Sequence, residues 1–222
     1  MHYIILIILI ILIILYITFE KCITRKQCKN QDDNGIIIKS INLNYDFMNS
    51  FIDNELNFFR NNNIITKFIN NENITNFLKN EITKTLGPDF FIADRGLWLR
   101  YYNSEKYINP FENWHYDRKR YCYNSKQYRM IINLFDNSTS KFCYTLKCMN
   151  NKEKCFTTQK NILVVIEANE ACHQIKIEKG ERLVLMVDVV NNSEKGICGT
   201  FFSILDYIWL NIIVNNFIGN VK

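Results

Sequence analysis

The chain has 222 residues and a mass of 26.5 kDa, which corresponds to one ordinary domain and not to two. Apolar residues make up 48% and charged residues 22%, so the chain can form a packed core and is not a disordered protein. The net charge of +5 is modest, and a cluster of basic residues lies within residues 21–29. A nucleic-acid interface over the domain is therefore excluded, and no nucleic acid is expected as a partner.

Residues 1–20 are predicted to form a transmembrane anchor. The segment from Met1 to Phe19 contains no charged residue, and most of its residues are Ile or Leu. About 20 apolar residues are needed for a helix to cross the ~30 Å hydrocarbon layer. A cleaved signal peptide would instead have a basic start and a small-residue cleavage site, and neither is present. We therefore expect a single-pass anchor in the endoplasmic reticulum or in a viral membrane.

The side of the membrane on which the domain lies stays open, because two signals conflict. The basic cluster after the apolar segment places the domain in the cytosol by the positive-inside rule. The 8 cysteines favour an oxidising lumen, although their spacing defines no disulfide connectivity.

Two further regions are predicted after the anchor. Residues 21–41 form a charged stalk, and residues 42–222 form one domain. Its first part, residues 42–88, has apolar residues at helical spacing and is predicted to contain two or three helices that end near Gly87 and Pro88. These apolar residues are Phe47, Phe51, Leu56, Phe59, Ile64, Phe68, Phe77 and Ile82.

From Arg95 onward the pattern changes to short apolar runs that are broken by polar turns. Near-regular spacing of such runs is typical of a sandwich or a barrel, so residues 95–190 are predicted to be a β-barrel core. The fold class is therefore mainly β with supporting helices (α+β), and an amphipathic helix is expected over residues 200–218. The predicted strands cover residues 97–102, 113–117, 128–135, 142–149, 155–158, 161–167, 173–177 and 182–190.

Two of the 3 histidines lie in this β-rich half, beside other polar residues. His115 and Asp117 are two residues apart, so on a strand both side chains point to the same face. His173 begins a segment that is predicted to be a hairpin, turning at residues 178–181 with Gly180 in the turn and Arg182 on the second strand. Two imidazoles and one carboxylate with open positions are the facial triad that suits non-haem Fe(II).

Arg182 is expected to face the barrel interior together with His173. A buried guanidinium is costly unless it meets an anion. His173 lies about 13 Å along the predicted hairpin from Arg182, whose side chain reaches back several ångströms. The remaining gap fits a small dicarboxylate that chelates the metal at one end and is held by Arg182 at the other.

These residues resemble the two-part motif of the 2-oxoglutarate/Fe(II)-dependent dioxygenase superfamily, most closely its prolyl-hydroxylase-like branch. His115 and Asp117 match the H-x-D element, and residues 173–182 match the frame H-x-[IV]-x-[IV]-x-x-G-x-R. The resemblance covers about residues 95–190 and implies a double-stranded β-helix (a jelly-roll or cupin-like barrel) behind supporting helices. A Gly-Gly turn that is usual in the prolyl branch is replaced here by residues 137–141.

The resemblance also implies a function and a set of roles. His115, Asp117 and His173 would be the catalytic metal ligands for Fe(II), and Arg182 would bind 2-oxoglutarate. Tyr102 and Tyr128 are the candidates for the tyrosines that hydrogen-bond this co-substrate. The reaction would use O₂ to hydroxylate a C–H bond, with a peptidyl, prolyl-type substrate as the leading candidate and ascorbate keeping the iron reduced.

Three other hypotheses compete with this one. Cys143, Cys148, Cys155 and Cys172 could bind Zn with His173, although no C-x₂-C pair is present. The chain could be a non-catalytic, membrane-anchored β-barrel protein, such as a viral or surface component with the same fold. It could also be a cupin-like metal protein that does not use 2-oxoglutarate.

Overall fold

The computed structural model describes residues 35–106, 114–117, 127–146, 153–168 and 171–191. Within these residues, no helix is long and apolar enough to span a membrane. The anchor predicted over residues 1–20 and the helix predicted over residues 200–218 lie outside the described residues.

Two helices precede most of the strands. α2 (Asp46–Asn61) buries five apolar side chains at helical spacing. α3 (Glu72–Leu86) begins at Asn71, whose side chain accepts a hydrogen bond from the Ile74 amide at 3.1 Å, and ends at Gly87, where φ is +106°. The helices predicted for residues 42–88 are therefore confirmed. The buried residues of α2 are Met48, Phe51, Ile52, Leu56 and Phe59.

Within the part of the chain that the structure describes, the strands form two antiparallel sheets, one of six strands and one of four. The larger sheet contains, in spatial order, β1 (Ile36–Ser40), β8 (Ile162–Glu167), β5 (Gln127–Ser138), β10 (Gly180–Val190), β3 (Phe91–Asn103) and β2 (Thr66–Phe68). The smaller sheet contains β4 (His115–Tyr116), β9 (Ala171–Lys176), β6 (Lys141–Leu146) and β7 (Lys154–Thr157).

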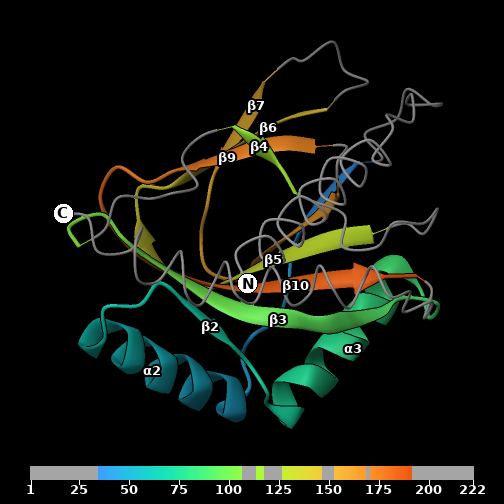
Figure 1. Ribbon diagram of the computed structural model, residues 1–222, viewed down its shortest axis with the longest axis horizontal. Helices are drawn as coiled ribbons and strands as arrows, with labels where there is room; N and C mark the ends of the chain where they lie inside the picture. The colour runs from blue at the N-terminus through green and yellow to red at the C-terminus, as the bar shows by residue number, and fades with distance from the viewer. Residues whose placement is uncertain (1–34, 107–113, 118–126, 147–152, 169–170, 192–222) are drawn as a thin grey trace, which may run out of the picture.

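From β3 to β10 the chain passes repeatedly between the two sheets, as in a double-stranded β-helix. Figure 1 shows α2 and α3 along the outer side of the larger sheet, with the smaller sheet on its opposite side. The helices therefore cover one face of the larger sheet, and its other face is turned toward the smaller sheet. The expected jelly-roll-like architecture is confirmed.

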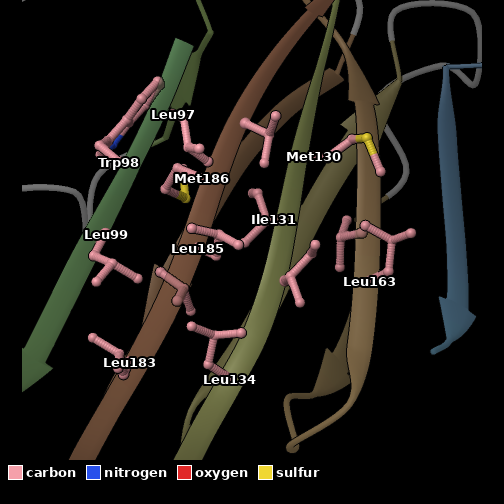
Figure 2. Close-up of a cluster of buried hydrophobic side chains, with 14 of the residues drawn as sticks. Leu97, Trp98, Leu99, Met130, Ile131, Leu134, Leu163, Leu183, Leu185 and Met186 are labelled. Atoms are coloured by element: carbon pink, nitrogen blue, oxygen red, sulfur yellow. The ribbon is translucent and has the colours of Figure 1, made fainter. Parts of the chain in front are cut away.

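The core lies mainly on the helical side of the larger sheet. Leu183, Leu185 and Val187 alternate along β10 and are fully buried. Phe59 of α2 stacks on Tyr101 of β3 with ring centroids 5.5 Å apart, which fixes the helix to the sheet. Figure 2 shows part of the cluster of buried hydrophobic side chains, carried by adjacent strands.

Three details differ from the predictions. Residues 36–40, assigned to the stalk, form the edge strand β1, which pairs with β8. Its alternation is hard to detect because Ile37 and Ile38 are exposed and only Ile36 is buried. The short strand β2 interrupts the helical region, because residues 66–68 pair with the edge of β3.

The third difference is the hairpin predicted between His173 and Arg182. β9 and β10 do not pair, because β9 lies between β4 and β6, whereas β10 lies between β3 and β5. The connection crosses from one sheet to the other. Period-two patterning defines the inward faces of strands but not their partners, so the predicted faces are right and the predicted pairing is wrong.

Candidate active site

Three potential metal ligands come together on the smaller sheet. His115 of β4 is paired directly with His173 of β9, and their ring centroids are 4.4 Å apart. Asp117 follows two residues after His115, and its Oδ2 lies 3.7 Å from His173 Nε2. One ligand atom from each residue lies within 4.8 Å of the others, which is the arrangement that a single metal ion requires.

His173 is held so that Nε2 faces this cluster. Its Nδ1 lies 3.2 Å from the Ala171 carbonyl oxygen, and the Phe142 ring stacks on the imidazole at 5.5 Å. Burial lowers the pKa of His173 to about 4, although the nearby Asp117 charge acts in the opposite direction. The ring is therefore neutral near pH 7, so Nδ1–H donates to the carbonyl and the Nε2 lone pair is left for a metal.

Asp117 is buried, and its two oxygens have different surroundings. Oδ1 accepts a hydrogen bond from Arg129 Nη1, whereas the buried Oδ2 has no hydrogen-bond donor. Burial raises the pKa of Asp117, but the combined effect of Arg129, the two histidines and Arg100 outweighs it, and the pKa is lowered. A buried carboxylate oxygen without a donor, beside two imidazoles, fits a divalent cation.

Arg182 lies on the larger sheet and is 1% exposed. Its Nε donates to Asn133 Oδ1 at 2.9 Å and lies 3.7 Å from Asp136 Oδ2, while Nη2 also contacts Asn133 Oδ1. The remaining group, Nη1, is buried and has no hydrogen-bond partner. Burial lowers the pKa of Arg182, yet a guanidinium stays charged, so Nη1 is an available donor for an anion.

The cluster of potential metal ligands and Arg182 line one cavity between the sheets, whose empty space, counted together with its opening to solvent, is about 340 Å³. Arginine side chains line one part of the cavity and the potential metal ligands line another, while several of the remaining lining residues are apolar. A cavity of this kind can hold a small anion that reaches from the metal ligands to Arg182. The lining residues are Arg100, Tyr102, His115, Asp117, Ile131, His173, Ile175, Arg182, Val184 and Met186.

The two candidate tyrosines lie in different places. Tyr102 lines the cavity, and its ring centroid is 5.8 Å from Arg182 Cζ. Tyr128 is not among the cavity-lining residues and instead packs against Phe90, with ring centroids 5.6 Å apart. Asn133, which is not among the residues predicted for the site, holds Arg182, and its signal is a buried amide within the apolar residues 130–135 of β5.

The cysteines do not form the alternative zinc site. Cys143 and Cys155 face each other across β6 and β7 and form a disulfide, which uses two of the four proposed sulfur ligands. Cys172 is not part of this disulfide, and Cys148 lies outside the described residues. The zinc hypothesis is therefore wrong for this arrangement.

No family model and no curated protein sequence matches the chain. Solved structures do match it. A prolyl 4-hydroxylase from Pseudomonas putida is 13% identical, with a TM-score of 0.50, over 71% of this chain and 93% of the other.

Two further structures are similar to the chain. A prolyl hydroxylase from Trichoplax adhaerens, in complex with a peptide fragment of the hypoxia inducible factor oxygen degradation domain, is 14% identical with a TM-score of 0.52, over 72% of this chain and 84% of the other. A viral collagen prolyl hydroxylase from Paramecium bursaria Chlorella virus-1 is 9% identical with a TM-score of 0.53, over 77% of this chain and 96% of the other. The chain therefore has the fold of the prolyl hydroxylases, as the resemblance implied.

Proposed function

We propose that this chain is a 2-oxoglutarate- and Fe(II)-dependent dioxygenase that hydroxylates a C–H bond. One observation carries the proposal. The same cavity contains the cluster of His115, Asp117 and His173 and, on its other side, the unpartnered Nη1 of the buried Arg182. A metal site alone would not require the second feature, because a buried guanidinium nitrogen without a hydrogen-bond acceptor is destabilising until an anion binds.

The residues of the cluster fit Fe(II). Two neutral imidazoles and one carboxylate are the ligand set of non-haem iron oxygenases, and Asp117 Oδ2 is available to a cation. Bound iron would activate O₂, so that 2-oxoglutarate, O₂ and the substrate give succinate, CO₂ and a hydroxylated product. Ascorbate is the proposed reductant that keeps the iron ferrous.

The residues around Arg182 fit a dicarboxylate. Arg182 would bind the distal carboxylate of 2-oxoglutarate through Nη1, while Asn133 and Asp136 orient the guanidinium from behind. Tyr102, which lines the cavity beside Arg182, is the tyrosine best situated to contact the co-substrate. The aliphatic side chains of Val184 and Met186 would exclude water from its carbon chain.

A peptidyl substrate of the prolyl type is the proposed acceptor of the hydroxyl group. The fold is shared with three prolyl hydroxylases, one of them in complex with a peptide and one described as a collagen prolyl hydroxylase. The cavity at the metal ligands would take one side chain, and the remainder of a peptide would lie outside it.

The proposal includes a membrane anchor over residues 1–20, a stalk and a catalytic domain, with the C-terminal amphipathic helix over residues 200–218. Because β1 belongs to the larger sheet, the stalk would end before Ile36. The Cys143–Cys155 disulfide supports an oxidising side of the endoplasmic reticulum or viral membrane, since disulfides rarely persist in the cytosol.

The first test uses the purified full chain in detergent, with Fe(II) and 2-oxoglutarate but without oxygen. We expect the weak visible charge-transfer band of the chelated co-substrate, and we expect His173→Ala and Arg182→Ala each to abolish it. No band in folded wild-type protein would reject the enzyme hypothesis in favour of the non-catalytic barrel. A cupin-like metal protein would bind Fe(II) with no dependence on Arg182.

A further inference from the structure

Arg129 of β5 connects the proposed iron ligand Asp117 to a second buried carboxylate. Its Nη1 donates to Asp117 Oδ1, while Nε donates to Asp188 Oδ1 at 2.8 Å and Nη2 to Asp188 Oδ2 at 3.3 Å. Asp188 is the residue directly opposite Arg129 on β10. The face of the guanidinium lies over the Trp98 ring, with Cζ 5.0 Å from the centroid. Arg129 is thus held from three directions.

This network is buried to a degree that is costly for charged groups. The side chains of Asp117 and Asp188 are 4% and 1% exposed, and that of Arg129 is 14% exposed. The buried Arg100, whose charge also lowers the pKa of Asp117, balances the second carboxylate, so the two arginines and two aspartates are neutral together. What the buried network lacks is a partner for Asp117 Oδ2, and a cation would supply it.

The hydrogen bonds also make the two oxygens of Asp117 inequivalent. Arg129 occupies Oδ1, and Oδ2 is left 3.7 Å from His173 Nε2 without a donor. A planar guanidinium can hold two carboxylates in fixed directions at once, whereas the single ammonium group of a lysine cannot reproduce this fork. The rotation of the Asp117 carboxylate is therefore set by Arg129.

We propose that Arg129 is a positioning residue that orients Asp117 for metal binding through Oδ2 alone, with Asp188 and Trp98 holding the guanidinium in place. This inference rests on the proposed function, because it assigns Arg129 a role toward the metal. It does not depend on the identity of the substrate. A network that served only to stabilise the sheets would leave metal affinity unchanged when it is replaced.

The test is an anaerobic titration of the full chain with Co(II), which reports coordination through its visible bands without any turnover. The main variant is Arg129→Met combined with Asp188→Asn, which removes one positive and one negative charge and leaves the net charge unchanged. We expect the Co(II) dissociation constant to rise about 10- to 100-fold, as is typical when a residue that orients a metal ligand is lost. The visible spectrum should also change, because Asp117 would be free to rotate.

Arg129→Lys is the second variant, because it keeps the charge inside the fold. We expect it to remain folded by circular dichroism and to bind Co(II) about 10-fold more weakly than the wild type. The matched control is Lys67→Met combined with Glu55→Gln, which removes an ion pair of 2.7 Å between β2 and α2, outside the cavity. Its Co(II) affinity should equal that of the wild type.

The outcomes separate the two proposals. If the wild type binds Co(II) and folded Arg129→Lys binds it with the same affinity and spectrum, Arg129 has no positioning role and the proposed function stands. If the wild type fails to bind Co(II) or Fe(II), the proposed function falls and this inference falls with it. Weakened binding in both Arg129 variants, but not in the control, supports the inference.

Discussion

At the scale of single residues, Arg182 is the group on which co-substrate affinity should depend most. A lysine at this position would keep the charge but lose the donor Nη1 and the paired contact with Asn133. We predict that Arg182→Lys raises the dissociation constant of 2-oxoglutarate by about 10- to 100-fold, which corresponds to about 1.4–2.8 kcal/mol. Anaerobic titration with 2-oxoglutarate in the presence of Co(II) measures it. Unchanged affinity would contradict the assignment of Arg182 to the co-substrate.

Glu181, the neighbour of Arg182, should contribute to the way in which the free energy of unfolding depends on pH under acidic conditions. The hydrogen bond from Arg60 lowers the pKa of Glu181 below its ordinary value of 4.5, although partial burial acts in the opposite direction. A carboxyl group with a lowered folded pKa stabilises the fold above its unfolded pKa, and this contribution is lost as the pH falls through the folded pKa.

We therefore predict that Glu181→Gln reduces the free energy of unfolding by about 1 kcal/mol at pH 7, because Arg60 is partly exposed and the pair is screened by solvent. The difference from the wild type should shrink below about pH 4.5. Urea unfolding at pH 7 and pH 3.5 measures the loss of unfolding free energy and its decrease at acidic pH. Glu178→Gln, at an exposed position, is the control and should change stability by less than about 0.5 kcal/mol. A constant difference across this range would show that the effect is not linked to the carboxyl proton.

The residues of the site differ in how well the sequence predicts them. That His115, Asp117, His173 and Arg182 meet at one cavity could be predicted, because short fixed spacings and one recognisable frame define them. Asn133 and Arg129 could not, since their roles arise from strand pairing with β10, about 50 residues further along the chain. Tyr128 was a reasonable candidate by position, but the strand directs it to Phe90 and away from the cavity.

At the scale of elements, the start of β10 determines where Arg182 lies. Gly180 has a φ of +92°, and a Cβ atom there would clash with the carbonyl oxygen of Asn137 and lie 2.9 Å from Ser138 Cα. We predict that Gly180→Ala lowers the free energy of unfolding by about 2–4 kcal/mol and weakens 2-oxoglutarate binding, because β10 must shift relative to β5.

The control for this change is Gly87→Ala at the end of α3. Gly87 also has a positive φ, +106°, but a Cβ there would meet nothing within 4 Å. Only the conformational cost of about 1 kcal/mol is expected, with unchanged 2-oxoglutarate affinity. Thermal or urea unfolding, together with co-substrate titration, compares the two. An equal loss of unfolding free energy in Gly180→Ala and Gly87→Ala would show that the contact of Gly180 with β5 is unimportant.

The strands themselves were predictable, whereas their partners were not. All eight predicted strands correspond to β3 to β10, because alternation and turn residues are local signals. The sheet to which each strand belongs is a long-range property, so a crossing between sheets was mistaken for a hairpin at residues 178–181. β1 escaped detection because an edge strand with two exposed isoleucines lacks a clear period.

At the scale of the whole molecule, the proposed ligands come from different sheets. His115, Asp117 and His173 belong to the smaller sheet or follow it directly, and Arg182 belongs to the larger sheet. We predict that Co(II) and 2-oxoglutarate together, without oxygen, raise the melting temperature by more than the sum of their separate effects. At 100 times its dissociation constant a ligand adds about 2.7 kcal/mol, which corresponds to roughly 5–10 °C for a domain of this size.

Differential scanning fluorimetry of the full chain measures these shifts. In Arg182→Lys the metal effect should persist, and the additional effect of 2-oxoglutarate should fall to about half or less, because its dissociation constant rises about 10- to 100-fold. Strictly additive shifts in the wild type would mean that the co-substrate does not bridge the two sheets.

The division of the cavity between two sheets has a consequence for the lifetime of the protein. A chain that has bound neither ligand lacks the bridge that the ligands would form between its sheets, and it keeps Asp117 Oδ2 and Arg182 Nη1 buried without partners. Such a chain opens more often, and opened chains are the ones that proteases cleave. Cellular abundance of this protein would then follow the supply of iron and of a central metabolite, with no dedicated sensor needed for either.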